Sequence, residues 1–192
     1  MRLKLIASDQ ELYILWLLET EGVMGRYWLA RMLGVSQGVA RGILARMRTR
    51  GLITVRPWAG AKASSKGRRQ LDGLMRRHRL RLVQRLDQAI LGLGPESVLF
   101  QVARSSSRLG QGIEQRDAAV KAGATGAVTF LFDGKTLRFP GVAERVSRRS
   151  PTTIRHLKEQ LKMKKGDIIL IAFGHTWWDA ARGGFAAVKT LV

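Results

Sequence analysis

One segment, Arg26–Lys62, constrains the fold of this 192-residue chain more than any other. Its pattern predicts a helix over Arg26–Leu33, which ends because Gly34 readily adopts the left-handed conformation of a helix C-terminus. Ser36 can then cap a second helix that extends to about Arg50. Two helices joined by so short a turn are typical of a helix-turn-helix.

A β-hairpin is predicted directly after these helices. The run Leu52–Val55 is rich in β-branched and aliphatic residues, and Pro57–Gly60 breaks it as a turn does. A helix-turn-helix followed by a hairpin is the order of elements in a winged helix. We therefore expect an N-terminal winged helix-turn-helix domain that binds DNA.

The second predicted helix has one apolar and one polar face. Ala40, Ile43, Leu44 and Met47 recur at the spacing of a buried stripe, so the opposite face should point outward. There an arginine can pair with guanine and a glutamine with adenine. The hairpin can add contacts to phosphates or the minor groove. The predicted DNA-binding residues are Ser36, Gln37, Gly38, Arg41, Arg46, Arg48, Arg56, Trp58 and Lys62. Two alternatives stay open: the arginines form an ordinary solvated face, or Trp58 folds back onto the core.

The charge of the chain supports an acidic partner. It has 34 Lys and Arg against 14 Asp and Glu, a net charge of +20. Nucleic acid, an anionic membrane or an acidic protein would suit this charge. From Arg41 to Arg85 we count 14 basic residues and one acidic residue, Asp72, which favours double-stranded DNA. No apolar run predicts a membrane span or a signal peptide, and cysteine is absent, so we expect a cytoplasmic protein that binds no membrane.

The residues after the hairpin predict one long helix from Ser64 to about Ile90. Its apolar stripe includes Leu71, Met75, Leu82 and Leu86, with His78 as a packed residue rather than a metal ligand. Such a helix could link two domains, or form the seam of a homodimer that binds palindromic DNA.

A domain boundary is predicted at Leu91–Pro95, which gives domains of residues 1–90 and 95–192. Beyond the boundary, the predicted strands are Ser97–Ala103, Thr125–Phe132, Lys135–Phe139 and Ile168–Phe173. Helices are predicted over Gly112–Ala122, from Pro151 to about Lys165, and over Thr176–Lys189. This alternation predicts a small α/β layer domain, so the whole chain is expected to be α+β.

The C-terminal half shows no set of catalytic residues. A polar loop, 104–112, leads into a helix N-terminus and could hold a phosphate or carboxylate, although an ordinary polar loop explains it as well. His175 follows a strand, where α/β domains place ligands. The candidate residues for a small anionic effector are Arg104, Arg108, Glu114, Gln115, Arg116, Asp117 and His175. We find no nucleophile with its base and no metal-ligand spacing, and predict no catalytic residue, cofactor or metal.

The segment GIEQRDAAVKAGATGAVTF, Gly112–Phe130, placed behind a winged helix, resembles a family of two-domain archaeal proteins. Their C-terminal half is a domain of unknown function. The resemblance implies a helix-turn-helix transcriptional regulator, with Gln115, Arg116 and Asp117 as the functional candidates of the second domain. The basic region 145–165 departs from the family pattern.

These observations predict a DNA-binding transcriptional regulator, dimeric, whose second domain binds a small anionic effector or mediates association. Two alternatives remain: a catalytic α/β domain acting on a nucleotide with an appended winged helix, and a chromatin or RNA binder indifferent to sequence. Charge alone does not distinguish a chromatin or RNA binder from a regulator, because phosphate contacts carry no sequence information.

Overall fold

The chain folds into two compact units, Met1–Leu74 and Met75–Val192, called here the N-terminal and the C-terminal unit. The computed structural model describes residues 9–86, 94–141, 155, 157 and 161–192. Helices and strands both occur, in two separate sheets, so the chain is of mixed α and β structure. In this described part, no helix is both long and apolar enough to cross a bilayer.

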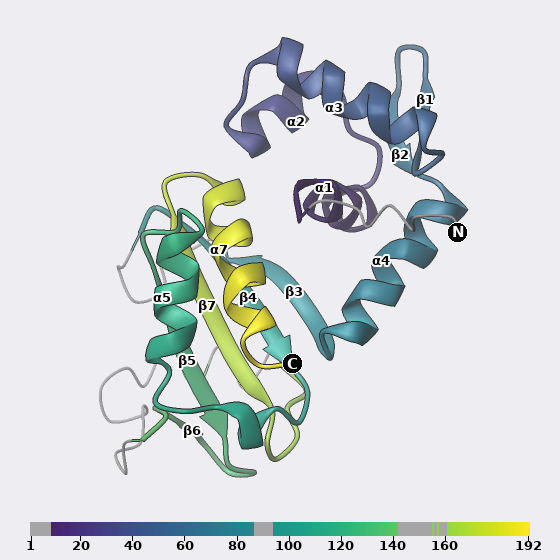
Figure 1. Cartoon of the computed structure of the whole chain (residues 1–192). Coiled ribbons are helices and arrows are strands. Elements are labelled where there is room, and N and C mark those ends of the chain that lie inside the picture. Colours follow the sequence, from purple (N-terminus) through teal and green to yellow (C-terminus); the bar gives the residue numbers. More distant parts are fainter. Residues whose placement is uncertain (1–8, 87–93, 142–154, 156, 158–160) are drawn as a thin grey trace, which may run out of the picture. The chain divides into compact units, whose positions relative to one another are not determined.

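The N-terminal unit consists of helices and a two-stranded hairpin (Figure 1). Its elements are α1 (Asp9–Thr20), α2 (Arg26–Leu33), α3 (Gln37–Thr49), β1 (Ile53–Arg56), β2 (Gly60–Ala63) and the greater part of α4 (Ser65–Arg77). The hairpin is antiparallel, and Met24 exchanges two backbone hydrogen bonds with Ala61 of β2. The chain that enters α2 is thereby fixed to the hairpin.

Helix α1 is buried over its whole middle. The sequence predicts an amphipathic helix over residues 9–21, with a one-sided stripe of Leu12, Leu15, Trp16 and Leu18. In the structure, every residue from Glu11 to Leu18 is buried. The one charged residue of this stretch, Glu11, accepts hydrogen bonds from the Arg50 guanidinium after α3. The ion pair explains how a carboxylate is tolerated in this position, because a buried charge needs a partner.

The single long helix predicted from Ser64 to Ile90 is wrong. Helix α4 ends at Arg77, and after a turn the chain continues as strand β3 (Leu80–Leu86). Arg79 has a φ of 50°, a left-handed conformation that no helix contains. The apolar stripe therefore divides between a helix and a strand, and its last residues, 87–90, lie outside the described part. A continuous helical seam for a dimer is thus not formed.

The C-terminal unit is built on a five-stranded sheet of order β3-β4-β7-β5-β6. Besides β3 it contains β4 (Glu96–Val102), the 3-10 helix η2 (Ser106–Arg108), α5 (Ile113–Lys121), β5 (Gly126–Phe132), β6 (Leu137–Arg138), β7 (Ile168–Gly174) and α7 (Trp177–Lys189). Every neighbouring pair is antiparallel. The expected α/β layer is therefore an α+β unit: β4 and β5 flank helix α5 in sequence, but β7 lies between them and pairs with both.

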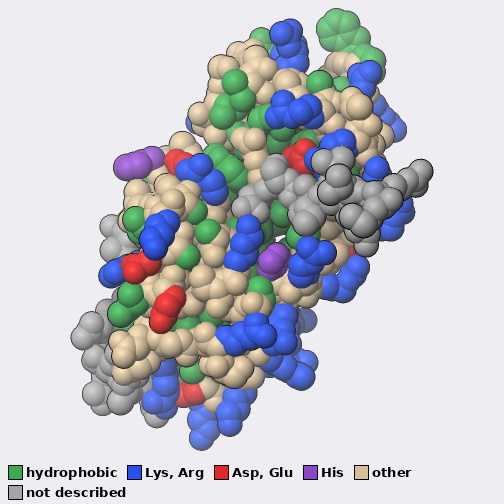
Figure 2. All heavy atoms as spheres, viewed as in Figure 1, with side chains coloured by type: hydrophobic (Ala, Val, Ile, Leu, Met, Phe, Trp, Pro, Cys, Tyr) green, Lys and Arg blue, Asp and Glu red, His purple; other side chains and the backbone are tan. Residues whose placement is uncertain are grey.

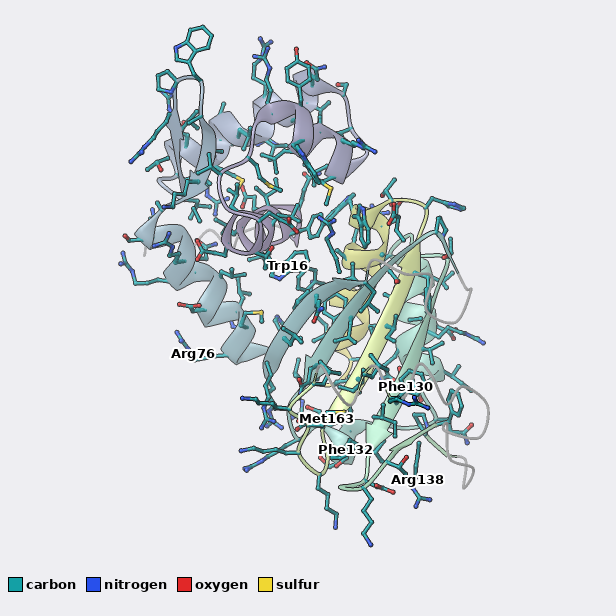
Figure 3. The ribbon with its side chains drawn as sticks, turned by 180° about the vertical axis from the view of Figure 1, so that it is seen from behind. Trp16, Arg76, Phe130, Phe132, Arg138 and Met163 are labelled. Carbon is teal, nitrogen blue, oxygen red and sulfur yellow. The ribbon has the colours of Figure 1, made fainter. Side chains whose placement is uncertain are left out.

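Helices α5 and α7 cover one face of this sheet (Figure 1). Helix α7 lies close because Gly184 faces Phe100, and a Cβ at Gly184 would come within 1.9 Å of that ring. The opposite face, which carries Phe130, Phe132 and Met163, is seen in Figure 3. Since both faces are covered, β7 is buried at every residue, which accounts for its uninterrupted apolar sequence.

The turn at Asp133-Gly134 connects β5 and β6. The Asp133 carboxylate accepts hydrogen bonds from the backbone amides of Thr136 and Lys135, and from the Arg138 guanidinium. These donors, with the Thr136 amide first, hold the pKa of Asp133 well below its usual value. The carboxylate thus remains ionised and fixes the turn.

The helix predicted from Pro151 to about Lys165 lies mostly outside the described residues. Arg155 and Leu157 are helical, but residues 161–164 are not. The predicted boundary Leu91–Pro95 also lies partly outside, and the division between the two compact units falls earlier, after Leu74.

Candidate nucleic-acid interface

The turn between α2 and α3 is fixed by local hydrogen bonds at the residues that the sequence predicts. Gly34 has φ 63° and ψ 33°, and its amide and that of Val35 close the end of α2 on carbonyls of that helix. The Ser36 hydroxyl accepts a hydrogen bond from the Val39 amide at 3.3 Å and so caps α3. In the structure, Ser36 thus acts as the N-terminal cap of α3.

The two faces of helix α3 carry side chains of different size. Ala40, Ile43 and Met47 are buried against the unit. On the opposite side Gly38, Gly42 and Ala45 recur at intervals of four and three and form a ridge of small residues. The exposed side chains of Gln37 and Arg41 lie along this ridge. Along the middle of the outward face, the side chains are therefore no larger than a methyl group, and longer side chains lie beside them.

Within the described residues, no steric contact requires glycine at positions 38 and 42 of this ridge. A Cβ at Gly38 would meet only the Ser36 hydroxyl within 4 Å, at 3.9 Å, and one at Gly42 only the Arg46 guanidinium, at 3.7 Å. Neither glycine has a positive φ. Glycine inside a helix costs roughly 0.5–1 kcal/mol relative to alanine. The close approach of another molecule would explain residues that the fold does not require.

The arginines of the N-terminal unit divide into two groups. Arg50 pairs with Glu11, and Arg68 pairs with Glu19 at 2.8 Å. In contrast, Arg41, Arg46 and Arg48 are exposed, and no carboxylate of the described residues pairs with any of them. The guanidinium groups on the outward face of α3 are thus available to an anionic partner.

The hairpin adds a second exposed region. Trp58, in the turn between β1 and β2, has φ 67° and a relative exposure of 105%. Its indole therefore does not fold back onto the core, which was the alternative left open by the sequence. Arg56 and Lys62 on the two strands are exposed as well. The hairpin thus presents one aromatic ring between two cations.

The effector residues predicted for the C-terminal unit are not brought together. Arg104 follows the end of β4, whereas His175 follows the end of β7, and these two strands run in opposite directions. Val102 pairs with Ile168 and Glu96 with Gly174, so the two residues lie at opposite ends of a seven-residue pairing, roughly 20 Å apart. The expectation for His175 came from parallel sheets and does not apply to an antiparallel one. Arg108, in η2, is exposed.

The four polar residues at the start of α5 have separate surroundings. Gln115 is buried and donates a hydrogen bond from Nε2 to the Thr190 hydroxyl at 2.6 Å, which ties α5 to the end of α7. Arg116 and Asp117 pair with each other on the surface at 2.9 Å. Glu114 is exposed, and its carboxylate lies over Gly110. Gln115 thus has a structural role, and Arg116 and Asp117 are bound to each other.

Asp167, which no sequence pattern indicated, accepts four hydrogen bonds in the C-terminal unit. Its fully buried carboxylate accepts hydrogen bonds from Arg81 Nη1 at 2.8 Å and Gln101 Nε2 at 3.0 Å. Two further donors are the backbone amides of Arg104, at 3.2 Å, and Lys164, at 2.9 Å. The pairing of β3 with β4 is irregular between Leu80 and Leu82, where Arg81 lies. One carboxylate thus joins three segments of the chain: β3, the end of β4, and the turn before β7.

Among the residues that the structure describes, no group of three or more histidines, aspartates and glutamates is placed to hold a metal ion.

The fold and sequence are similar to those of proteins of unknown function. The hypothetical protein PH0730 from Pyrococcus horikoshii OT3 is 19% identical and superimposes with a TM-score of 0.75, over 96% of this chain and 92% of that one. At this identity the likeness concerns the fold. No curated protein matches the chain. Residues 93–191, just over half of the chain, match the model of a domain of unknown function, DUF4443, so the protein belongs to the DUF4443 family.

Proposed function

We propose that the N-terminal unit is a winged helix that binds double-stranded DNA, and that the protein is a transcriptional regulator. Helix α3 would enter the major groove and the hairpin would serve as the wing. The observation that carries the proposal is the outward face of α3. It combines three arginines that have no acidic partner among the described residues with a ridge of small residues.

The shape of α3 supports insertion into a groove. A ridge formed by Gly38, Gly42 and Ala45 allows the helix backbone to approach the base edges closely. Gln37 and Arg41, near the N-terminal end, would then read bases, since arginine pairs with guanine and glutamine with adenine. The fully exposed Trp58, between Arg56 and Lys62, suits the minor groove or the sugar-phosphate backbone.

Few side chains on α3 can read bases, so one copy of the helix would recognise a short sequence. The proposal therefore includes a homodimer, because two-fold symmetry doubles the number of base pairs that are read. The C-terminal unit would mediate this association or bind a small anionic effector. Sedimentation with and without an operator duplex would establish the stoichiometry.

Selection of bound sequences from a random duplex library tests the proposal. We expect one enriched sequence, bound at least roughly a thousandfold more tightly than its scrambled version at physiological salt. Both affinities should be measured by fluorescence anisotropy at several salt concentrations. Equal affinity for selected and scrambled duplexes would instead identify a nucleic-acid binder that is indifferent to sequence.

Replacing Gly42 with alanine should separate folding from binding. The methyl group has space, so Gly42→Ala should stabilise the N-terminal unit by about 0.5–1 kcal/mol. In a close interface the same methyl group should weaken DNA binding by about 1 kcal/mol or more. Denaturation and anisotropy measure the two effects.

Gly73→Ala in α4 is the matched control, because a Cβ there meets nothing within 4 Å. It should stabilise its helix similarly and leave DNA binding unchanged. If Gly42→Ala bound DNA as tightly as the unmodified protein, α3 would not approach the bases closely.

A further inference from the structure

The C-terminal unit carries a large share of the positive charge of the chain. Residues 75–192 include 21 Lys and Arg against 9 Asp and Glu, whereas residues 1–74 include 13 against 5. The net charges are thus +12 and +8, close to the same charge per residue. A DNA-binding N-terminal unit does not account for the charge of the C-terminal unit.

Part of this charge is concentrated at one end of the five-stranded sheet. We call the sheet-end cluster the six residues Arg79, Arg81, Arg104, Lys162, Lys164 and Lys165, all exposed. Figure 3 shows side chains ending in nitrogen that project from the end of the sheet near Met163. On the face of the molecule drawn in Figure 2, Lys and Arg side chains are more widespread than Asp and Glu.

Hydrogen bonds hold these residues together from distant parts of the sequence. Asp167 binds the Arg81 side chain and the backbone amides of Arg104 and Lys164. The carbonyl of Lys162 accepts from Gln101, which also donates to Asp167. Arg79 donates to the carbonyl of Arg104 at 3.4 Å.

The cluster has a strong excess of positive charge. Its six members are all basic, and the carboxylate that pairs with Arg81, that of Asp167, is fully buried. No carboxylate of the described residues pairs with the other five side chains. Like charges gathered in this way repel one another, and a polyanion would relieve the repulsion and release its own counterions.

The surroundings of the cluster identify the kind of polyanion. The large apolar side chains exposed in the described part of this unit are Ile113 and Val120, both in α5, and no exposed aromatic residue lies in the cluster. Single-stranded nucleic acid is usually bound by aromatic stacking, and membrane surfaces by inserted apolar groups. A surface of lysine and arginine that has neither exposed aromatic rings nor exposed apolar groups is typical of contacts to duplex phosphates.

We infer that the sheet-end cluster is a second DNA-binding surface, which contacts the phosphate backbone of duplex DNA without reading its sequence. The inference goes beyond the proposed function, because it concerns the C-terminal unit and does not require α3 to bind bases. It predicts that part of the affinity for random duplex depends on residues outside the N-terminal unit.

The double variant Lys164→Ala/Lys165→Ala tests this inference in the full chain. Both side chains can be shortened without loss of the Asp167 network, to which Lys164 contributes only its backbone. On a random duplex we expect at least about tenfold weaker binding near physiological salt, and a log–log salt dependence less steep by about 1.8. The matched control is Arg116→Ala/Lys121→Ala on α5, with the same change in charge and an expected effect below about twofold.

Equal effects of the two variants would overturn the inference, since net charge alone would then explain the binding. An unchanged affinity of the lysine variant would overturn it too. So would loss of sedimentation with phosphatidylserine vesicles while DNA binding is kept, which would identify a membrane surface. Lys164→Gln/Lys165→Gln repeats the test if the alanine variant melts at a lower temperature. If changes in α3 left binding to the selected duplex intact, while the lysine variant weakened binding to random duplex, only the proposed function would be contradicted.

Discussion

Replacing Arg41, Arg46 and Arg48 together with alanine is expected to abolish specific DNA binding. If each guanidinium contributes about 1–3 kcal/mol, the affinity for the selected sequence falls by about 3–9 kcal/mol, more than a hundredfold. The fold should be preserved, because none of the three side chains pairs with a carboxylate in the described part of the chain. Anisotropy titrations with selected and scrambled duplexes measure the effect.

The control for this prediction removes the same charge elsewhere. Arg116, Lys121 and Lys189 are exposed on α5 and α7, and their triple alanine variant should retain the preference for the selected sequence. The single variant Arg41→Ala refines the result: a loss of about 1–3 kcal/mol on the selected duplex alone would mark Arg41 as a base contact. Equal losses on both duplexes would mark it as a phosphate contact.

Replacing Asp167 with alanine should have the largest effect on stability. The change leaves the amides of Arg104 and Lys164 and the side chain of Gln101 without their acceptor, and Arg81 without its partner. Removing one member of a buried ion pair typically costs about 3–5 kcal/mol. Because domains are stable by only about 5–15 kcal/mol, a substantial part of the stability of the C-terminal unit would be lost.

Hydrogen exchange of the β7 amides in the full chain measures this loss without assuming that the two units unfold together. The matched control is Asp117→Ala, which removes an exposed ion pair and should change stability by less than about 1 kcal/mol. Comparable protection of β7 in the two variants would show that Asp167 does not hold the segments together.

The local structure of the N-terminal unit was predictable because its signals lie within a few residues of one another. Gly34 ends α2, Ser36 caps α3 through Val39, and the hairpin turn contains Pro57. Apolar residues at helical spacing also indicated the buried side of α3. Such features depend on backbone preferences that act locally, so the sequence contains them directly.

The break between α4 and β3 could not be predicted in the same way. No glycine or proline separates Arg77 from Leu80, and the left-handed turn is made by Arg79. In the sequence that follows, Leu80, Val83 and Leu86 recur at helical spacing, not at the period of two that a regular strand shows. Pairing with β4 decides between the two, and that contact is tertiary.

The role of Asp167 was hidden for a related reason. Its side-chain partners Arg81 and Gln101 lie 86 and 66 positions away in the sequence. An aspartate after a Lys-Gly pair looks like an ordinary turn residue until the fold brings these partners together. Likewise, the sheet order follows from the insertion of β7 between β4 and β5, which no local pattern encodes.

The irregular pairing at Arg81 has a consequence for the solubility of the protein. Strand β3 lies at one margin of the sheet, and a flat, uncharged edge strand would be open to pairing with another chain. The irregularity between Leu80 and Leu82 opposes such pairing by its shape. At the other margin β6 has only two residues and offers little to pair with. Both margins of the sheet are thus protected against edge-to-edge aggregation.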